Sequence, residues 1–205
     1  MKTGTKSLLF GVHQFIWHPI TVWLAWVWLY HKLPTFKETI CIVIHDWGYW
    51  GKSDIDGENG ERHPETGAKM AHTLFDTVPK LKWVGHPCQD DRNIIDLRDK
   101  KYYNFCLLHS RHYARNAGKE PSALCWADKL SIIFEPWWLY LPRAWASGEL
   151  VEYRRVANQT CFVPSTASHR DWYRCLQERL STLGRSQCAD IVPYANPIRN
   201  PADNI

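Results

Sequence analysis

The sequence predicts one mostly α-helical domain. Apolar residues recur at helical spacing in several segments, proline and N-cap residues stand at the starts of these segments, and turn-forming residues separate them. No stretch of the sequence repeats. A chain of 205 residues, of which 45% are hydrophobic, is long enough to bury one sizeable core.

The first expected helix lies in the aromatic-rich segment Phe15–Tyr30. Pro19 fits the first turn of a helix and places His18 near its N-cap, and the helix should end before Pro34. The segment has 16 residues, fewer than the roughly 20 that cross a bilayer. No small-residue cleavage site of a signal peptide follows it. We therefore expect a buried helix, no membrane partner and a cytoplasmic protein.

A second helix should begin after Thr35 and carry the chain into His45 and Asp46. The β-branched run Ile40–Ile44 also suits a strand, and so short an apolar stretch does not decide between the two. The glycine- and aspartate-rich segment Trp47–Glu61 predicts a loop.

Further helices are expected along the rest of the chain: from about His63 through Leu74, from Lys100 to Ser110, from Ser122 through Ile133, and from Asp171 to Leu183. Between them, Val78–Arg98 is rich in turns and Trp137–Trp145 is expected to be aromatic cover. The chain after Pro193 looks irregular. We therefore divide the sequence into a helical domain over 1–150 and a helical and irregular C-terminal extension over 151–205 that packs on it.

Composition limits the function. The net charge of +4 is mild and the charges are mixed, so no nucleic-acid partner is expected, while small anionic substrates fit. Twelve tryptophans suggest rigid core walls and an aromatic pocket. The seven cysteines form no C-x-x-C pair, which argues against a zinc ribbon and a disulfide framework and favours a reducing compartment.

His45 and Asp46 end an apolar run, where a buried imidazole and carboxylate are costly unless they are paired or bind a metal. A buried His–Asp hydrogen bond, or an interaction of His45 with a helix dipole, would also explain them. Four more such side chains stand near element ends or in apolar surroundings: His18, His63, His109 and Asp128. Mixed imidazole and carboxylate ligands suit Fe, Mn, Co, Ni or Zn, and with several carboxylates Mg.

The order His18…His45-Asp46…His63…His109…Asp128 resembles the HD superfamily of metal-dependent phosphohydrolases, over roughly residues 13–135. Three local contexts are similar to segments of that family, in particular of its bacterial diadenosine-tetraphosphate hydrolases: His18-Pro19-Ile20-Thr21, His63-Pro64-Glu65-Thr66-Gly67-Ala68 and Ala127-Asp128-Lys129. The resemblance implies an HD-domain-like helical bundle that binds one or two divalent metal ions, with Asp46 bridging the ions and His45 a ligand of one of them.

Some ligand assignments have rivals. His13 competes with His18, and His112 competes with His109, since residues three apart lie near one face of a helix. His63 could instead cap the helix that follows it.

The resemblance also implies roles around the metals. We expect Asp46, Lys129 and His112 to be catalytic, and Lys52, Arg62, Arg111 and Trp47 to bind substrate, because cations neutralise the phosphates in phosphoryl transfer. The loop residues Asp54, Asp56 and Glu58 lack the rest of an EF-hand pattern. A supporting or substrate-facing role, such as general acid, suits them better.

The expected function is hydrolysis of a phosphoester or phosphoanhydride in a small nucleotide-like substrate by a metal-activated water. Two alternatives use the same fold. Some HD relatives are di-iron oxygenases with a similar ligand set, and a non-catalytic nucleotide-sensing module would keep the fold without the reaction.

Overall fold

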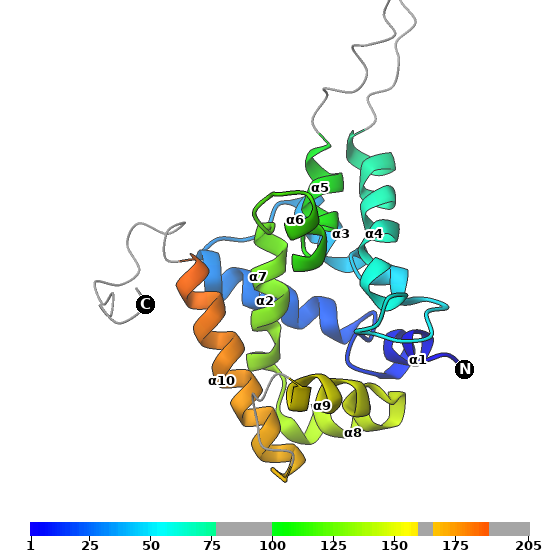
Figure 1. Ribbon diagram of the computed structural model, residues 1–205. Helices are drawn as coiled ribbons and strands as arrows, with labels where there is room; N and C mark the ends of the chain where they lie inside the picture. The colour runs from blue at the N-terminus through cyan, green and yellow to red at the C-terminus, as the bar shows by residue number, and fades with distance from the viewer. Residues whose placement is uncertain (77–99, 160–165, 189–205) are drawn as a thin grey trace, which may run out of the picture.

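The computed structural model describes residues 1–76, 100–159 and 166–188 (Figure 1). Within these ranges the regular structure is helical and contains no strand, so the predicted all-α class is confirmed. The helices and short helical turns follow one another in this order: α1 (Thr3–Phe10), α2 (Trp17–Tyr30), α3 (Phe36–Ile44), η1 (Trp47–Tyr49), η2 (Gly60–Arg62), α4 (Pro64–Ala71), η3 (His72–Asp76), α5 (Lys101–Leu107), α6 (Arg111–Asn116), α7 (Ala123–Leu130), η5 (Ser131–Phe134), α8 (Trp137–Ser147), α9 (Glu149–Gln159) and α10 (His169–Cys188).

Helix α3 decides between helix and strand for the run Ile40–Ile44. The Thr35 hydroxyl accepts a hydrogen bond from the Glu38 N–H at 3.3 Å, and the Glu38 carboxylate accepts one from the Thr35 N–H at 2.7 Å. This capping box satisfies two N–H groups at the helix start, so the chain enters a helix that continues to Ile44. The strand alternative is wrong.

Two other expectations differ from the structure. The segment Trp47–Glu61 is not loop throughout, because η1 begins directly after Asp46 and η2 begins at Gly60. The segment expected as aromatic cover is the helix α8. The expectations for the turn-rich segment Val78–Arg98 and for the tail after Pro193 lie outside the described residues.

The tryptophans line the core less than expected. Trp26, Trp126 and Trp172 are buried in the two largest apolar clusters. Seven others expose more than a third of their surface: Trp17, Trp28, Trp47, Trp50, Trp137, Trp138 and Trp145. The number of tryptophans in a sequence does not show which of them are buried, so composition alone could not separate exposed tryptophans from core tryptophans.

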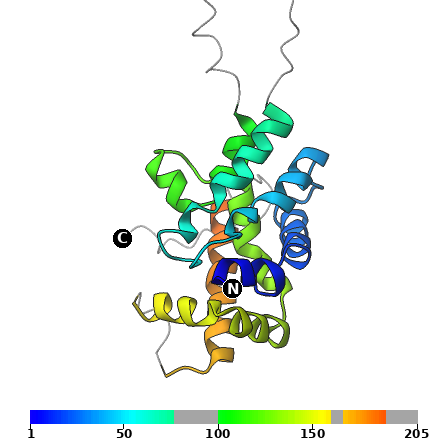
Figure 2. The same cartoon turned by 90° about the vertical axis from the view of Figure 1, so that its right-hand side faces the viewer.

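The described helices pack around several apolar clusters, of which two are the largest (Figures 1 and 2). One core joins α2, α3 and α7, and α10 lies along α7. A second core joins Val12, η5, α8 and α10, with α8 packed against α9. The expected domain boundary at residue 150 falls inside α9. None of the described helices has the length and apolar character needed to cross a bilayer.

Close backbone contact brings α4 against the end of α3. A Cβ atom added to Gly67 would lie 2.8 Å from the carbonyl oxygens of both Ile44 and His45. Only glycine allows this approach, because any side chain at position 67 would meet backbone atoms rather than a movable side chain. The contact positions His63, just before α4, beside His45 and Asp46.

Candidate metal centre

The structure brings together all six side chains that the sequence indicated as metal ligands. They come from the start of α2, the end of α3, the start of α4, the turn after α5, and α7: His18, His45, Asp46, His63, His109 and Asp128. Five of them are buried, and the side chain of Asp128 is 13% exposed. They form two groups of close donor atoms, and Asp46 belongs to both.

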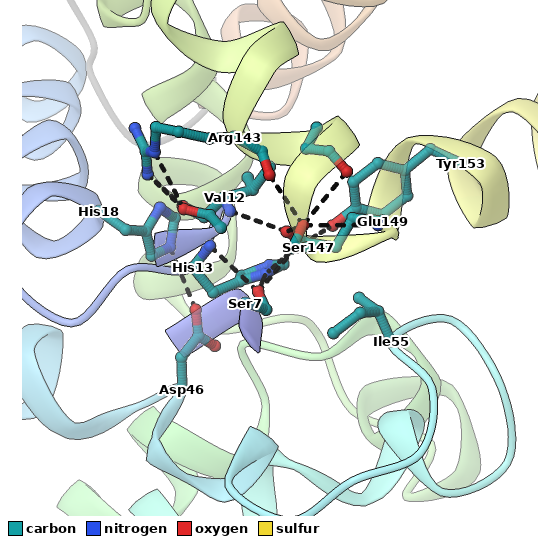
Figure 3. A network of polar contacts seen from close by, with 12 residues as sticks. Ser7, Val12, His13, His18, Asp46, Ile55, Arg143, Ser147, Glu149 and Tyr153 are labelled. Atoms are coloured by element: carbon teal, nitrogen blue, oxygen red, sulfur yellow. Dashed lines mark hydrogen bonds and ion pairs between the residues drawn. The ribbon is translucent and has the colours of Figure 1, made fainter. Parts of the chain in front are cut away.

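The first group surrounds one oxygen of Asp46. Its Oδ2 lies 3.2 Å from His18 Nε2 and 3.2 Å from His45 Nε2. Asp128 Oδ1 lies 3.2 Å from His18 Nε2 and 3.9 Å from His45 Nε2. Two imidazoles and two carboxylates thus face one small volume, and Figure 3 shows the His18–Asp46 side of it.

The second group surrounds the other oxygen of Asp46. Asp46 Oδ1 lies 3.4 Å from His63 Nε2 and 3.5 Å from His109 Nε2. The two imidazole nitrogens lie 3.0 Å apart. The carboxylate of Asp46 therefore directs one oxygen at each group, which is the arrangement of a ligand that bridges two ions.

Local hydrogen bonds fix three of the imidazole rings. The Nδ1 of His45 lies 2.7 Å from the Ile42 carbonyl oxygen, that of His63 2.7 Å from Gly60, and that of His109 2.5 Å from Cys106. A carbonyl only accepts, so Nδ1 carries the proton in each ring. Each neutral ring then presents a lone pair at Nε2 towards Asp46, as a metal ligand does.

The donor spacing fits metal ions. Two donor atoms at about 2.1 Å from one ion lie about 3.0 Å apart at a right angle and about 3.4 Å apart at a tetrahedral angle. The closest pairs in both groups lie between 3.0 and 3.5 Å apart. Among the described residues, His18 Nε2, His45 Nε2 and Asp46 Oδ2 are buried atoms that have no hydrogen-bond partner. The carboxylates among them need positive charge nearby, which protons on the imidazoles or a metal ion can supply.

The same electrostatics shift the pKa values of the first group. Burial alone lowers the pKa of His18, but the nearby carboxylates of Asp128 and Asp46 outweigh burial and raise this pKa to about 9. Burial also lowers the pKa of His45, but the charge of Asp46 and the carboxylate of Asp128 outweigh it and raise this pKa to about 10. Burial alone would raise the pKa of Asp46, yet the charge of His45 and the other imidazoles around Asp46 lower it well below its usual value. Without a metal, protons on His18 and His45 supply the positive charge that the carboxylates need.

In the second group the pKa of His63 shifts in the opposite direction to those of His18 and His45. Burial lowers the pKa of His63 well below its usual value, and the charge of Asp46 opposes this only in part. His63 is therefore a neutral imidazole at physiological pH. Its ring is held by Tyr49, which stacks on it at 3.9 Å between centroids with an interplanar angle of 14°.

The rival residues lie outside both groups. The Nδ1 of His13 lies 2.9 Å from both Ser7 Oγ and Glu149 Oε1 (Figure 3). His112 is near Glu61 and Asn116 instead, and its side chain is 39% exposed. His63 does occupy the N-cap of α4, but its side chain makes no capping hydrogen bond.

A cavity of about 590 Å³ borders the first group, with His18 and Asp128 in its wall. Lys129, which was expected to be catalytic, and Arg111, which was expected to bind substrate, line it, and Arg115 adds a further cation. Lys129 Nζ also lies 3.3 Å from Asp128 Oδ2. The charge of Asp128 raises the pKa of Lys129 and keeps it protonated.

Other expected site residues are not part of that cavity wall. Trp47 is 42% exposed, Arg62 pairs with Glu65 at 3.2 Å, and Lys52 and His112 do not line the cavity. Their roles in substrate binding and catalysis stay predictions. Among the loop carboxylates, Asp56 lines the cavity, Asp54 accepts the Gly60 N–H at 2.7 Å, and Glu58 is exposed.

Sequence reasoning missed a buried carboxylate next to the site. Glu149 is fully buried and accepts hydrogen bonds from the Ser7 hydroxyl at 2.7 Å, from the Val12 N–H at 2.8 Å and from the Ser147 hydroxyl at 2.5 Å (Figure 3). His13 also lies against it. Glu149 follows a glycine at a helix start, a position at which glutamate is usually exposed, so no local signal identified it.

No known protein family, curated protein or solved structure matches this chain. The geometry of the six side chains and of the cavity beside them is therefore the basis for inferring a function.

Proposed function

We propose that this protein is a phosphohydrolase that uses two divalent metal ions to cleave a phosphoester or phosphoanhydride in a small, nucleotide-like substrate. His18, His45, Asp46 and Asp128 would hold one ion, and Asp46, His63 and His109 the other. The resemblance of the ligand order to the HD superfamily supports the same conclusion. When bound, such a pair of ions lowers the pKa of water and offsets the charge on an attacked phosphorus.

One observation carries the proposal. The two oxygens of Asp46 face two separate groups of buried donor atoms, at 3.2 Å on one side and at 3.4 and 3.5 Å on the other. A histidine–aspartate pair that served only to stabilise the core would need one partner for each carboxylate oxygen, whereas here four imidazole nitrogens converge on one carboxylate.

The cavity supports an anionic substrate. Lys129 and Arg111 line it on the side of α7 and α6, and Arg115 lies one helical turn after Arg111. Ammonium and guanidinium groups beside a metal centre bind phosphate oxygens and stabilise the charge that develops on them during transfer. The aromatic side chains Tyr140 and Tyr153 in the same wall suit the sugar or base of a nucleotide.

The test is metal analysis of the purified protein, followed by phosphate release from nucleoside mono-, di- and triphosphates, cyclic nucleotides and dinucleoside polyphosphates. We expect two ions per chain and hydrolysis that does not depend on oxygen. Asp46→Asn should lower kcat/KM by about 10²- to 10³-fold or more. Asp171→Asn, at an exposed aspartate of α10, is the matched control and should leave the rate unchanged.

Metal-loaded protein that hydrolyses none of these compounds would contradict the proposal. A reaction that consumes oxygen and requires iron would instead favour the di-iron oxygenase class. Binding of a nucleotide without turnover would favour a sensing module.

A further inference from the structure

Helix α2 has an apolar outer side as well as an apolar inner side. It contains no charged residue, and Val22, Ala25, Trp26 and Leu29 on its inner side pack in the core with α3 and α7. Figure 2 shows α2 and α3 at the outer edge of the described helices. Seven large hydrophobic side chains there, each between 38% and 57% exposed, form what we call the α2 face: Phe15, Ile16, Trp17, Ile20, Leu24, Trp28 and Val43.

The α2 face is wide for an exposed stripe. At 100° per residue, its members from Ile16 to Trp28 cover an arc of about 120° on α2. A helix on a protein surface normally has one apolar stripe of this width and buries it against the core. Because α2 already buries its inner stripe, the α2 face is a second stripe of the kind that packs against another element.

The face contains a groove and a ridge. The groove has a volume of about 380 Å³ and lies between α2 and α3. None of the residues that line it is charged: Phe15, Ile16, Pro19, Ile20, Trp23, Thr39, Ile42 and Val43. Leu24 and Trp28 follow Ile20 at intervals of four residues, so they lie along the same side of α2 and form a ridge beyond the groove. Arg185 lies over the Trp28 ring, at 4.7 Å from its centroid, and still leaves this side chain exposed.

The area of the face is that of an interface. Its seven side chains expose roughly 500 Å² of apolar surface, since a whole large side chain presents on the order of 150–200 Å². A homodimer interface of standard size covers about 800 Å² on each copy, of which about 65% is apolar. The α2 face therefore supplies the apolar area that a stable homodimer needs.

The charge of the face favours a second copy of this chain. Two identical surfaces that meet about a twofold axis bring like charges close together, and the α2 face carries none to repel. The ridge and the groove also complement each other, because the ridge projects and the groove receives. A helix that lies on a bilayer instead carries Lys and Arg beside its apolar side, and α2 contains neither.

We propose that the α2 face is a homodimer interface in which the α2 helices of two copies pack antiparallel. Leu24 of each copy faces Ile20 of the other, and Trp28 of each copy faces Ile16 of the other, so that each ridge lies over the opposite groove. The inference does not depend on the proposed function, since it uses no residue of the candidate metal centre.

The test is sedimentation velocity of the full chain, purified with its own metal, between about 1 and 100 μM, because interfaces of this size bind with Kd values from micromolar to picomolar. We expect a species of twice the chain mass of 24.0 kDa. Leu24→Lys, which puts a charge on each copy near the axis, should weaken association by about 100-fold or more. Val151→Lys, at an exposed aliphatic position of α9, is the matched control and should remain dimeric.

Two further variants test the arrangement itself. Ile20→Lys should also give a monomer, and it replaces Leu24→Lys if thermal unfolding shows that Leu24→Lys is not folded. An equal mixture of Leu24→Lys and Ile20→Glu chains should form a heterodimer although each variant alone is monomeric, because the opposite charges meet across the axis. Absence of the heterodimer would overturn the antiparallel packing.

Two results would overturn the interface as a whole. The first is a monomer at every concentration. If that monomer also binds phosphatidylcholine vesicles and Leu24→Lys does not, the face belongs to a lipid surface. The second is a dimer that persists in both Leu24→Lys and Ile20→Lys, since such a dimer uses another surface.

Discussion

His63 Nε2 lies 3.0 Å from His109 Nε2, and the Nδ1 of each ring is hydrogen bonded to a backbone carbonyl three residues earlier. Both nitrogens that face each other therefore present lone pairs in the neutral rings. A proton between them is disfavoured, because burial lowers the pKa of His63 well below its usual value. A metal ion beside Asp46, as in the proposed function, would remove the repulsion between these lone pairs.

Substitutions in the two donor groups should change metal content differently. His63→Ala or His109→Ala should reduce bound metal from about two ions per chain to about one, because in the proposed function each group would bind its own ion. Asp46→Ala should abolish both. Inductively coupled plasma mass spectrometry of protein purified without chelator measures the content. His112→Ala, in the rival of His109, is the control and should retain both ions; loss of metal there would contradict the assignment.

Metal binding should release protons from the first group. The pKa values of His18 and His45 are raised to about 9 and about 10, so both are protonated at pH 7 and must lose their protons to bind an ion. We expect the release of about two protons at pH 7, measured by calorimetry in buffers of different ionisation enthalpy. Heats that are the same in every buffer would show that no protons are released.

Protein stripped of metal should lose stability as the pH rises. The folded-state pKa values of His18 and His45 lie above the unfolded value of 6.5. Their contribution to stability is therefore fully present below about pH 6.5 and is lost as the pH rises through 9 to 10. Melting temperatures of chelator-treated protein should fall over that window, and His45→Gln should flatten the fall. Metal-loaded protein should not show it.

Glu149 should stabilise the fold. Replacing it by Gln leaves donors from Ser7, Ser147 and His13 without their charged acceptor, and we expect a loss of about 3 kcal/mol in the free energy of unfolding. Burial alone raises the pKa of Glu149, but hydrogen bonds and charge from His13 and hydrogen bonds from both serines lower it overall. Its contribution is present above the unfolded pKa of 4.5 and is lost as the pH falls through the lower folded value.

Urea titrations at neutral pH and at about pH 3.5 measure this effect. The difference between the unmodified protein and Glu149→Gln should shrink at the lower pH. Glu178→Gln, at an exposed position of α10, should have little effect at either pH. A difference that is constant with pH would show that the charge of Glu149 is not involved.

Two glycine substitutions should have opposite effects. In Gly67→Ala the new Cβ would lie 2.8 Å from two backbone oxygens of α3 and its C-cap, so we expect a loss of about 1–3 kcal/mol and weaker metal binding. In Gly184→Ala, within α10, the nearest atom is a Leu130 side-chain carbon at 3.5 Å. This ordinary contact should leave a gain in stability of up to about 1 kcal/mol from helix propensity. Thermal unfolding of both variants provides the comparison, and a stable Gly67→Ala would contradict the close approach.

The parts of the fold that the sequence predicted well are governed by local interactions. The helix expected from His18 to about His31 is observed at Trp17–Tyr30, because proline at a helix start and a following proline act within a few residues. The six ligand candidates came from an order of residues along the chain, and the structure brings them together.

The parts that could not be predicted depend on packing between distant segments. Ser7 and Glu149 are hydrogen bonded although 142 positions separate them in the sequence. Glu135 joins a cavity wall only because α8 and α10 cover it, through Arg143 and Tyr173. His13 and His18 were equal in chemistry, and only the position of Glu149 assigns His13 to another network. Contacts between such distant segments cannot be predicted from the neighbouring residues in a single sequence.

The hydrogen bonds from His45, His63 and His109 to the carbonyl three residues earlier also hold the three imidazole rings in place. Each ring loses its rotational freedom when its own helical turn forms, so the entropy cost of ordering these ligands is met before any ion arrives. The partners are main-chain atoms, which substitution of neighbouring side chains does not remove. The arrangement of these imidazoles can therefore persist while the side chains around the cavity change, so under the proposed function one such centre would serve differently shaped substrates.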